Sequence, residues 1–416
     1  MQRKDYRGYE ISGASPDSLL LFEEALRLFQ SWRTDPLSVL EQAIARSPRF
    51  VMARVLCGYI YLCSRDPVNT QKARRSISAL ADAPANERER QHLAIVEALI
   101  AADYETAHAL LSALLDRYPK EVLALQVAHA FDYLLGNTRQ LRDRVAHVLP
   151  RYPKDLPGHS AVAVMYAFGL AENADFSRAV DWGMHALECD PGNPRALHAL
   201  AHVHEMTLQF MAGRRWMVEH AAQWSQGSTV ATHCWWHLAL FSLRSGDPDA
   251  ALDVYDQYIR SRQTETVADL IDASSLLWRL TLEDHAVGGR WDELAEKWAP
   301  HVWDGFCAFN DMHAMMAFAA AGRWRAAALL IEHQTLRARQ TDTNAMMTRS
   351  VGMPACKGLL AYGCGHYDEA AGLLSKLPEI AYRLGGSNAQ HGVIGLTNAA
   401  ARVRAAALGA GNRKAA

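Results

Sequence analysis

A short turn pattern recurs along the chain and restricts its fold more than any other feature. Each copy begins with a glycine or alanine, which suits a tight turn between two antiparallel helices. Most copies place a second small residue five positions later, where the two helices can pack closely. In residues 246–259 the aromatic Tyr255 follows Ala251 by four positions, as in the second helix of a tetratricopeptide repeat. The copies begin at Ala102, Gly136, Ala174, Gly246, Gly289, Gly322 and Gly365.

Short segments that end in proline separate several of these helix pairs, at Pro119, Pro153 and Pro191. Proline lacks a backbone N–H and therefore ends one helix before the next begins. The pattern predicts an all-α fold, a tetratricopeptide-type right-handed superhelical solenoid of roughly eight to ten helix pairs. We expect residues 1–16 to form an N-terminal arm, residues 17–404 a continuous α-solenoid of tetratricopeptide-like repeats, and residues 405–416 a frayed C-terminal tail.

Composition restricts the classes of partner. The formal net charge is −2, without a sustained basic stripe, so we expect no nucleic acid and no anionic membrane as partners. No run of about 18 uncharged apolar residues occurs, and no apolar segment follows the N-terminal charges, so we expect no membrane span or secretory signal. The 7 cysteines are scattered without a Cys-x-x-Cys pair, which favours reduced thiols in a cytoplasmic protein. The oligomeric state is not indicated.

One expected helix, residues 194–206, is unusually rich in histidine. With Leu200 and Ala201 at the buried positions 7 and 8 of the repeat, four polar residues fall at positions 2, 5, 9 and 12, which face the concave groove. These residues are Arg195, His198, His202 and Glu205. His204 falls at position 11, so we expect it to be buried between helices.

The following repeats extend the polar set. His233 and Trp236 take groove-facing positions, His237 is borderline, and Trp235 belongs to the core. Cys234 takes a position that points away from the groove. One repeat further, Arg279 and Glu283 are spaced i, i+4, which also fits an ordinary helix salt bridge. In the next repeat, Asp311 and His313 are two residues apart and therefore cannot share one helical face.

These runs resemble the tetratricopeptide repeat protein 38 family, and the similarity covers almost the whole chain. The chain departs from the family pattern at Asn388, where histidine is common, and at His391, where arginine is common. The resemblance implies an α-superhelix and a soluble, cytosolic protein, but no reaction. The matching runs are Ala199-Leu-Ala-His202-Val-His-Glu205-Met, His233-Cys-Trp235-Trp236-His237-Leu-Ala-Leu, Leu277-Trp278-Arg279-Leu, Asn310-Asp311-Met-His313-Ala and Gly385-Gly386-Ser387-Asn-Ala389-Gln390.

Three kinds of function fit this set. The lead interpretation is a binding protein that holds a small, carboxylated ligand or a peptide in the groove, because repeat arrays commonly bind partners. Its ligand-binding candidates are Arg195, His198, Trp236, Arg279 and Glu283. The alternative is a hydrolase or lyase that uses histidine–carboxylate acid–base chemistry. Its catalytic candidates are His202, Glu205, His233, His237, Asp311 and His313.

Metal binding is the third kind of function. His198 and His202 have ligand spacing on a helix, and Glu205 or His233 could complete a site. Arg195 on the same face repels a cation, and a third well-spaced ligand is not evident, so we expect no metal and no cofactor. A nucleophilic pair of Cys234 with a neighbouring histidine is disfavoured because this thiol points away from the groove.

Overall fold

The structure is a computed structural model that describes residues 3–64, 66–80 and 82–415, with side chains described as far as residue 410. Within these ranges the secondary structure is helical except for short strands near the N-terminus and one isolated bridge between Arg33 and Ser228. Strands β1 (Arg3–Lys4) and β2 (Glu10–Ile11) pair antiparallel, with Arg3 opposite Ile11. The predicted all-α repeat class is therefore confirmed.

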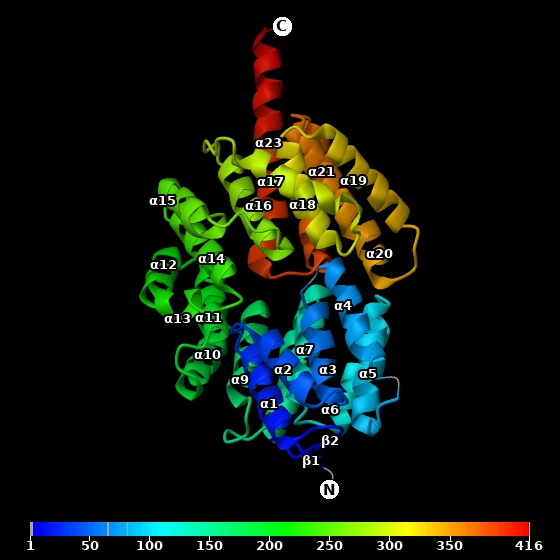
Figure 1. Ribbon diagram of the computed structural model, residues 1–416. Helices are drawn as coiled ribbons and strands as arrows, with labels where there is room; N and C mark the ends of the chain where they lie inside the picture. The colour runs from blue at the N-terminus through cyan, green and yellow to red at the C-terminus, as the bar shows by residue number, and fades with distance from the viewer. Residues whose placement is uncertain (1–2, 65, 81, 416) are drawn as a thin grey trace. The chain divides into compact units, whose positions relative to one another are not determined.

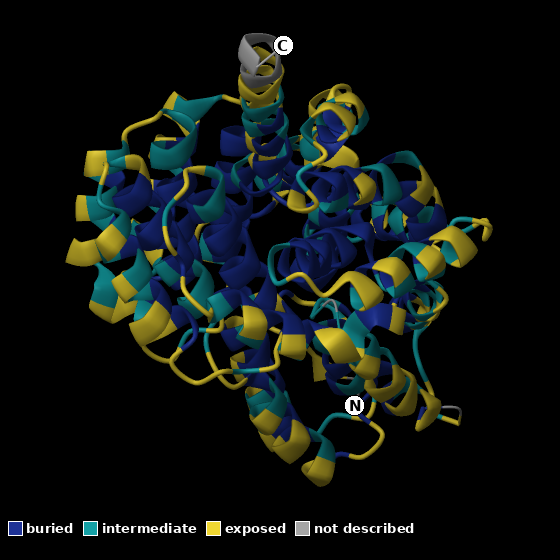
Figure 2. Cartoon of the chain, turned by 90° about the horizontal axis from the view of Figure 1, so that it is seen from above, coloured by how far each residue is buried: buried dark blue, intermediate teal, exposed yellow. Residues whose placement is uncertain are grey.

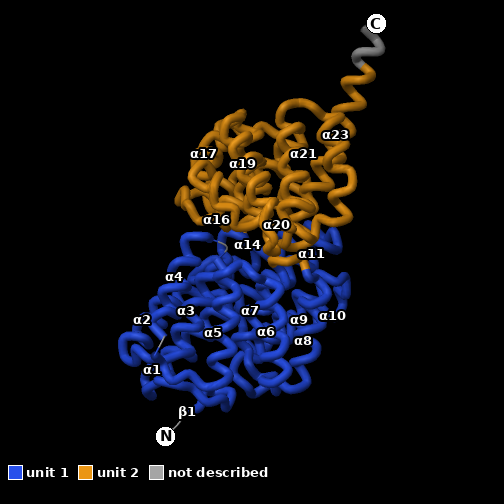
Figure 3. The backbone as a smooth tube through the Cα atoms, turned by 90° about the vertical axis from the view of Figure 1, so that its right-hand side faces the viewer, with its two compact units in different colours: residues 1–133, 137–234 blue, residues 134–136, 235–416 orange. Residues whose placement is uncertain are grey.

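The chain divides into two compact units, which Figure 3 shows in blue and orange. Residues 1–133 and 137–234 form the first unit, and residues 134–136 and 235–416 form the second. The boundary after Cys234 falls inside helix α14 (Ala231–Arg244). The single continuous solenoid expected from the sequence stays a prediction.

In the first unit, successive helices pack against one another in pairs such as α1 with α2, α3 with α4, and α9 with α10 (Figure 1). Its helices are α1 (Pro16–Gln30), α2 (Pro36–Arg46), α3 (Val51–Leu62), α4 (Pro67–Ser78), α5 (Glu87–Ile100), α6 (Tyr104–Arg117), α7 (Val122–Leu134), α8 (Thr138–Val148), the 3-10 helix η1 (Leu149–Arg151), α9 (His159–Glu172), α10 (Phe176–Cys189), α11 (Pro194–Met206), α12 (Phe210–Glu219) and α13 (Ala221–Ser225).

In the second unit, α18 packs against α16, α17, α19 and α21, and α23 packs against α16 and α22. Its helices are α15 (Pro248–Val254), the π-helix η2 (Tyr255–Ile259), α16 (Val267–Leu282), α17 (Arg290–Trp298), the 3-10 helix η3 (Ala299–Trp303), α18 (Ala308–Ala320), α19 (Trp324–Arg337), α20 (Thr343–Met347), the π-helix η4 (Thr348–Gly352), α21 (Met353–Gly363), α22 (Tyr367–Leu374), the 3-10 helix η5 (Leu377–Leu384) and α23 (Asn388–Ala415). Helix α23 includes residues 405–415, for which fraying stays a prediction.

The recurring turns join helices as the sequence predicts. Ala102 and Ala174 take φ values of 57° and 61°, and Gly246 and Gly322 take 83° and 65°, all in the left-handed region. One position is wrong by a residue. Gly289 has φ −79° and caps α17, so the left-handed turn falls on Gly288 instead.

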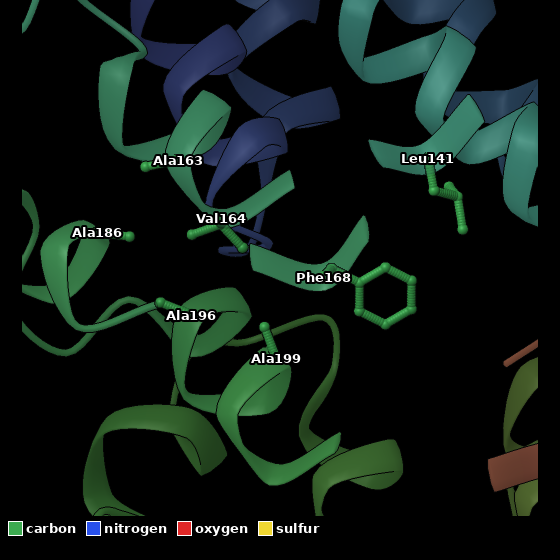
Figure 4. Packing of buried hydrophobic residues seen from close by; sticks show 7 residues of the cluster. All are labelled: Leu141, Ala163, Val164, Phe168, Ala186, Ala196 and Ala199. Carbon is green, nitrogen blue, oxygen red and sulfur yellow. The ribbon is translucent and has the colours of Figure 1, made fainter. Parts of the chain in front are cut away.

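Figure 2 colours buried residues dark blue and exposed residues yellow, and many helices carry both colours. Helix α9 is the most deeply buried element of the first unit, with nearly all of its side chains withdrawn from solvent. Small residues on α10 and α11 let these two helices approach it closely. Figure 4 shows this core, made by Leu141, Ala163, Val164, Phe168, Ala186, Ala196 and Ala199. Because α9 and α11 pack together here, polar groups on their facing sides are held at fixed positions.

The contact of α8 with α9 depends on Gly169. A Cβ atom added there would lie 2.3 Å from the carbonyl oxygen of Leu141, closer than van der Waals contact allows. We expect Gly169→Ala to lower the free energy of unfolding by about 1–3 kcal/mol, because the helices must separate. The exposed Gly372 in α22 is the matched control, since nothing lies within 4 Å of its added Cβ. Gly372→Ala should raise stability by about 0.5–1 kcal/mol in the same denaturant titration. Equal effects at the two positions would contradict the close contact.

Candidate functional site: a buried three-histidine centre

Three histidines of the first unit converge. His198 and His202 lie one turn apart on α11, with their Nε2 atoms 3.0 Å apart. His233, near the start of α14, places its ring centroid 5.0 Å from that of His198 and 6.5 Å from that of His202. One ring nitrogen from each residue lies within 4.8 Å of those of the other two. We call His198, His202 and His233 the three-histidine centre.

Glu172, the last residue of α9, supplies a carboxylate to this centre. Its Oε1 atom lies 3.5 Å from Nδ1 of His202, and both side chains are about 1% exposed. Sequence reasoning assigned the carboxylate to Glu205 and missed Glu172. The available signal was a glutamate at the end of a mostly apolar helix, because a buried charge requires a partner. An acceptor at Nδ1 orients the imidazole so that Nε2 faces the other histidines.

Burial sets the charge of these imidazoles. Burial lowers the pKa of His198 well below its usual value, and the neighbouring His202, His233 and Arg195 act in the same direction. Burial also lowers the pKa of His202, although Glu172 opposes this effect. Burial therefore favours the neutral form of both rings, which is the form that binds a metal ion or accepts a proton.

Arg195 does not face an open groove. Its side chain is 4% exposed, and the guanidinium donates hydrogen bonds to the side-chain oxygen of Gln126 and to the carbonyl oxygen of Gln30, the latter at 3.3 Å. It also lies 4.9 Å from the ring centroid of Trp32. One guanidinium nitrogen is thus directed at protein acceptors, and the expected role of Arg195 in ligand binding stays a prediction.

The end of α11 differs from the repeat register in one respect. His204 was expected to be buried between helices. It is instead half-buried beside Trp216 of α12, with ring centroids 6.3 Å apart. The reason is that α11 ends at Met206, so the last turn has fewer neighbours. Glu205 is also half-buried and lies three residues beyond His202 on the same helix.

The tryptophans of α14 reverse the expected assignment. Trp236, predicted to face the groove, is fully buried, whereas Trp235, predicted for the core, is half-buried and stacks on Tyr258 with ring centroids 3.7 Å apart. Stacking on a second aromatic ring shields Trp235 without enclosing it. His237 is buried one turn after His233 on the same helix, and Cys234 is also buried.

Arg279 is also a buried residue of the second unit. It is 5% exposed, and its guanidinium lies 5.6 Å from the ring centroid of Trp236. It donates to the carbonyl oxygen of Ala389 at 2.8 Å and to that of Ser275 at 3.0 Å. Glu283, the i, i+4 partner that the sequence offers to Arg279, is exposed at the end of α16 and lies 3.6 Å from His285.

Asp311 and His313 point to different neighbours, as their spacing predicts. Asp311 is buried and accepts a hydrogen bond of 3.1 Å from Gln334 of α19. His313 is fully buried, and its Nδ1 lies 2.8 Å from the carbonyl oxygen of Phe309. The structure therefore does not join the two into one catalytic pair.

Asp311 predicts a pH dependence of stability. Burial raises its pKa to about 7, although Gln334 lowers it. Since the folded pKa exceeds the unfolded value, this group stabilises the fold fully below about pH 4, and the stabilisation is lost as pH rises through 7. The total change is on the order of 4 kcal/mol. Asp311→Asn should remove this pH dependence and be more stable than the wild type at pH 8. The exposed Asp368→Asn should retain it in the same pH series of unfolding measurements.

No protein-family model matches the chain. Among solved structures, the chain is similar to a monomeric mutant of IFIT1 with Gppp-AAAA, at 14% sequence identity and a TM-score of 0.42. The match covers 91% of this chain and 85% of that chain. A similarity at this level concerns the fold alone. Its own helix pairs and turns define the chain as a tetratricopeptide-like repeat protein.

The exclusion of nucleic acid as a partner needs correction. The IFIT1 structure contains Gppp-AAAA, a finding that runs against the expected exclusion. The exclusion rested on the net charge and on the lack of a sustained basic stripe in the sequence, and neither describes a surface that is assembled by folding. No helix in residues 3–64, 66–80 and 82–415 is both long and apolar enough to cross a bilayer.

Proposed function

We propose that the chain is a metal-binding repeat protein in which His198, His202 and His233 hold a transition-metal ion of the zinc type. The observation that carries this proposal is that three ring nitrogens lie within 4.8 Å of one another, with a carboxylate oxygen of Glu172 3.5 Å from His202 Nδ1. Two nitrogens bound to the same tetrahedral zinc ion lie about 3.3 Å apart. The 3.0 Å between His198 Nε2 and His202 Nε2 is close to this value.

The two sequence-based objections to a metal have physical answers. The missing third ligand is His233, which the register placed in the groove but could not place beside His198. Arg195 directs its hydrogen bonds at Gln30 and Gln126, and its charge helps keep His198 neutral. A neutral imidazole binds a cation without first losing a proton.

The three histidines supply three of the four ligands of a tetrahedral ion. A carboxylate oxygen is a suitable fourth ligand for zinc, so the small carboxylated ligand expected from the sequence fits this centre better than Arg279. We further propose that the protein is cytoplasmic and is related to the tetratricopeptide repeat protein 38 family, on the basis of the polar runs described above.

A second candidate function is supported by the contact between His202 and Glu172. A carboxylate that fixes the tautomer of an imidazole is also the arrangement of a general base, so these residues could serve metal-free acid–base catalysis. Glu172 then takes the place of Glu205 in the catalytic set.

Metal titration separates the two functions. Protein treated with a chelator and then dialysed is titrated with Zn²⁺ in a calorimeter, and its thermal unfolding is recorded with and without the ion. We expect binding and a rise in the unfolding temperature, because an ion bound only by the folded state stabilises it by about 2.7 kcal/mol at one hundred times Kd. No binding at all, or binding that His202→Asn does not weaken, would leave the acid–base function as the better explanation.

A further inference from the structure

Another cluster of metal-binding side chains lies elsewhere in the first unit. Helix α10 carries His185 and Cys189 one turn apart, and His159 is the first residue of α9. The Nε2 atoms of His159 and His185 are 3.1 Å apart, and Cys189 Sγ lies 3.8 Å from His185 Nε2. Each pair of these donor atoms lies within 4.8 Å.

The opposite nitrogens of both rings face acceptors. Nδ1 of His159 lies 3.2 Å from the carbonyl oxygen of Tyr152, and Nδ1 of His185 lies 3.5 Å from the carboxylate of Glu188. An acceptor at Nδ1 favours the tautomer that carries its proton there and leaves the lone pair on Nε2. Two such lone pairs 3.1 Å apart repel each other unless a proton or a cation lies between them.

The distances fit a tetrahedral ion. With zinc–nitrogen and zinc–sulfur bonds of about 2.05 and 2.3 Å, nitrogen donors lie about 3.3 Å apart, and a sulfur and a nitrogen donor about 3.6 Å apart. The separations of 3.1 and 3.8 Å differ from these values by only a few tenths of an ångström. Mixed thiolate and imidazole donors select zinc or a similar ion over magnesium or calcium, which prefer oxygen.

We propose that His159, His185 and Cys189 form a second metal site, of the zinc type, with a fourth coordination position open to small ligands. His159 and Cys189 both line a cleft of about 580 Å³, which also borders Arg27 of α1 and Lys154. His185 and Cys189 are reachable from solvent, since the first is partly and the second largely exposed. This site shares no residue with the three-histidine centre and does not depend on it.

Cobalt titration tests the proposal, because a cobalt–thiolate bond gives a charge-transfer absorption that a cobalt–imidazole bond lacks. Wild-type protein that has been treated with a chelator, dialysed and kept reduced should develop this absorption when Co²⁺ is added. Cys189→Ser should abolish it, and His185→Gln should weaken Co²⁺ binding there by at least about tenfold. Cys364→Ser replaces another exposed thiol and should leave the absorption unchanged.

The cobalt experiment can fail independently of the test of the three-histidine centre. His202→Asn should retain the thiolate absorption even though it disrupts the three-histidine centre. Wild-type protein without this absorption, or Cys189→Ser protein that keeps it, would overturn the second site whatever the three-histidine centre binds. In that case the contact between His159 and His185 is an ordinary hydrogen bond between imidazoles.

Discussion

His202→Asn should lower the affinity of the three-histidine centre for Zn²⁺ by at least about one-hundredfold, because it removes a ligand and the contact with Glu172 together. Glu172→Gln keeps all three imidazoles but weakens the acceptor at Nδ1 of His202. Its loss of affinity should therefore be smaller, about ten- to one-hundredfold. Both variants should be titrated in the Cys189→Ser background, so that only one of the proposed sites contributes.

His204 provides the matched control for this series. It lies on the same helix, is half-buried and packs beside Trp216, away from the converging nitrogens. His204→Asn should bind Zn²⁺ with wild-type affinity in the same calorimetric titration. A loss of affinity as large as that of His202→Asn would mean that helix α11 had been disturbed in general. An unchanged affinity in His202→Asn would show that the three-histidine centre does not bind the Zn²⁺ ion.

Arg279→Ala should lower the free energy of unfolding by roughly 3–5 kcal/mol, as is typical when one partner of a buried polar network is removed. The truncation takes hydrogen bonds from the carbonyl oxygens of Ser275 and Ala389 and leaves a gap beside Trp236. Arg279→Lys should restore only part of the loss, because one ammonium group cannot reach both carbonyl oxygens with the geometry of a guanidinium.

Arg323 gives the comparison within the same unit. It is exposed and pairs with Asp292 at 3.1 Å, so Arg323→Ala should cost less than about 1 kcal/mol in urea unfolding. A similarly small cost for Arg279→Ala would show that Arg279 is solvated and would restore it as a candidate for binding a carboxylated ligand.

Much of the fold could be predicted from local sequence. Helix pairs follow from the period of apolar residues and from turns that require a left-handed residue, and Gly246 and Gly322 do take this conformation. The choice between Gly288 and Gly289 could not be made, because either glycine can adopt the turn and the packing of α17 decides. The boundary between the two units after Cys234 has no local signal in the sequence, since it falls within the continuous helix α14.

The candidate site was predicted only in part, for a similar reason. The spacing of His198 and His202 on one helix is a property of that helix and could be read directly. Their meeting with His233 and Glu172 depends on how α9, α11 and α14 pack, which no single helix specifies. The repeat register also predicts toward which side of a helix a side chain points, but not how deeply that side chain is buried. It therefore assigned Arg195 and Arg279 to a groove, whereas the structure buries both side chains against protein acceptors.

X-ray absorption at the zinc edge tests the central claim most directly. The sample is Cys189→Ser protein with one equivalent of Zn²⁺. The substitution removes the sulfur ligand of the second site and leaves the three-histidine centre intact. The spectrum should show three imidazole ligands with zinc–nitrogen distances of about 2.0–2.1 Å, one further light ligand and no sulfur. A zinc ion coordinated mainly by oxygen, with at most one imidazole, would contradict the proposal that His198, His202 and His233 hold the metal.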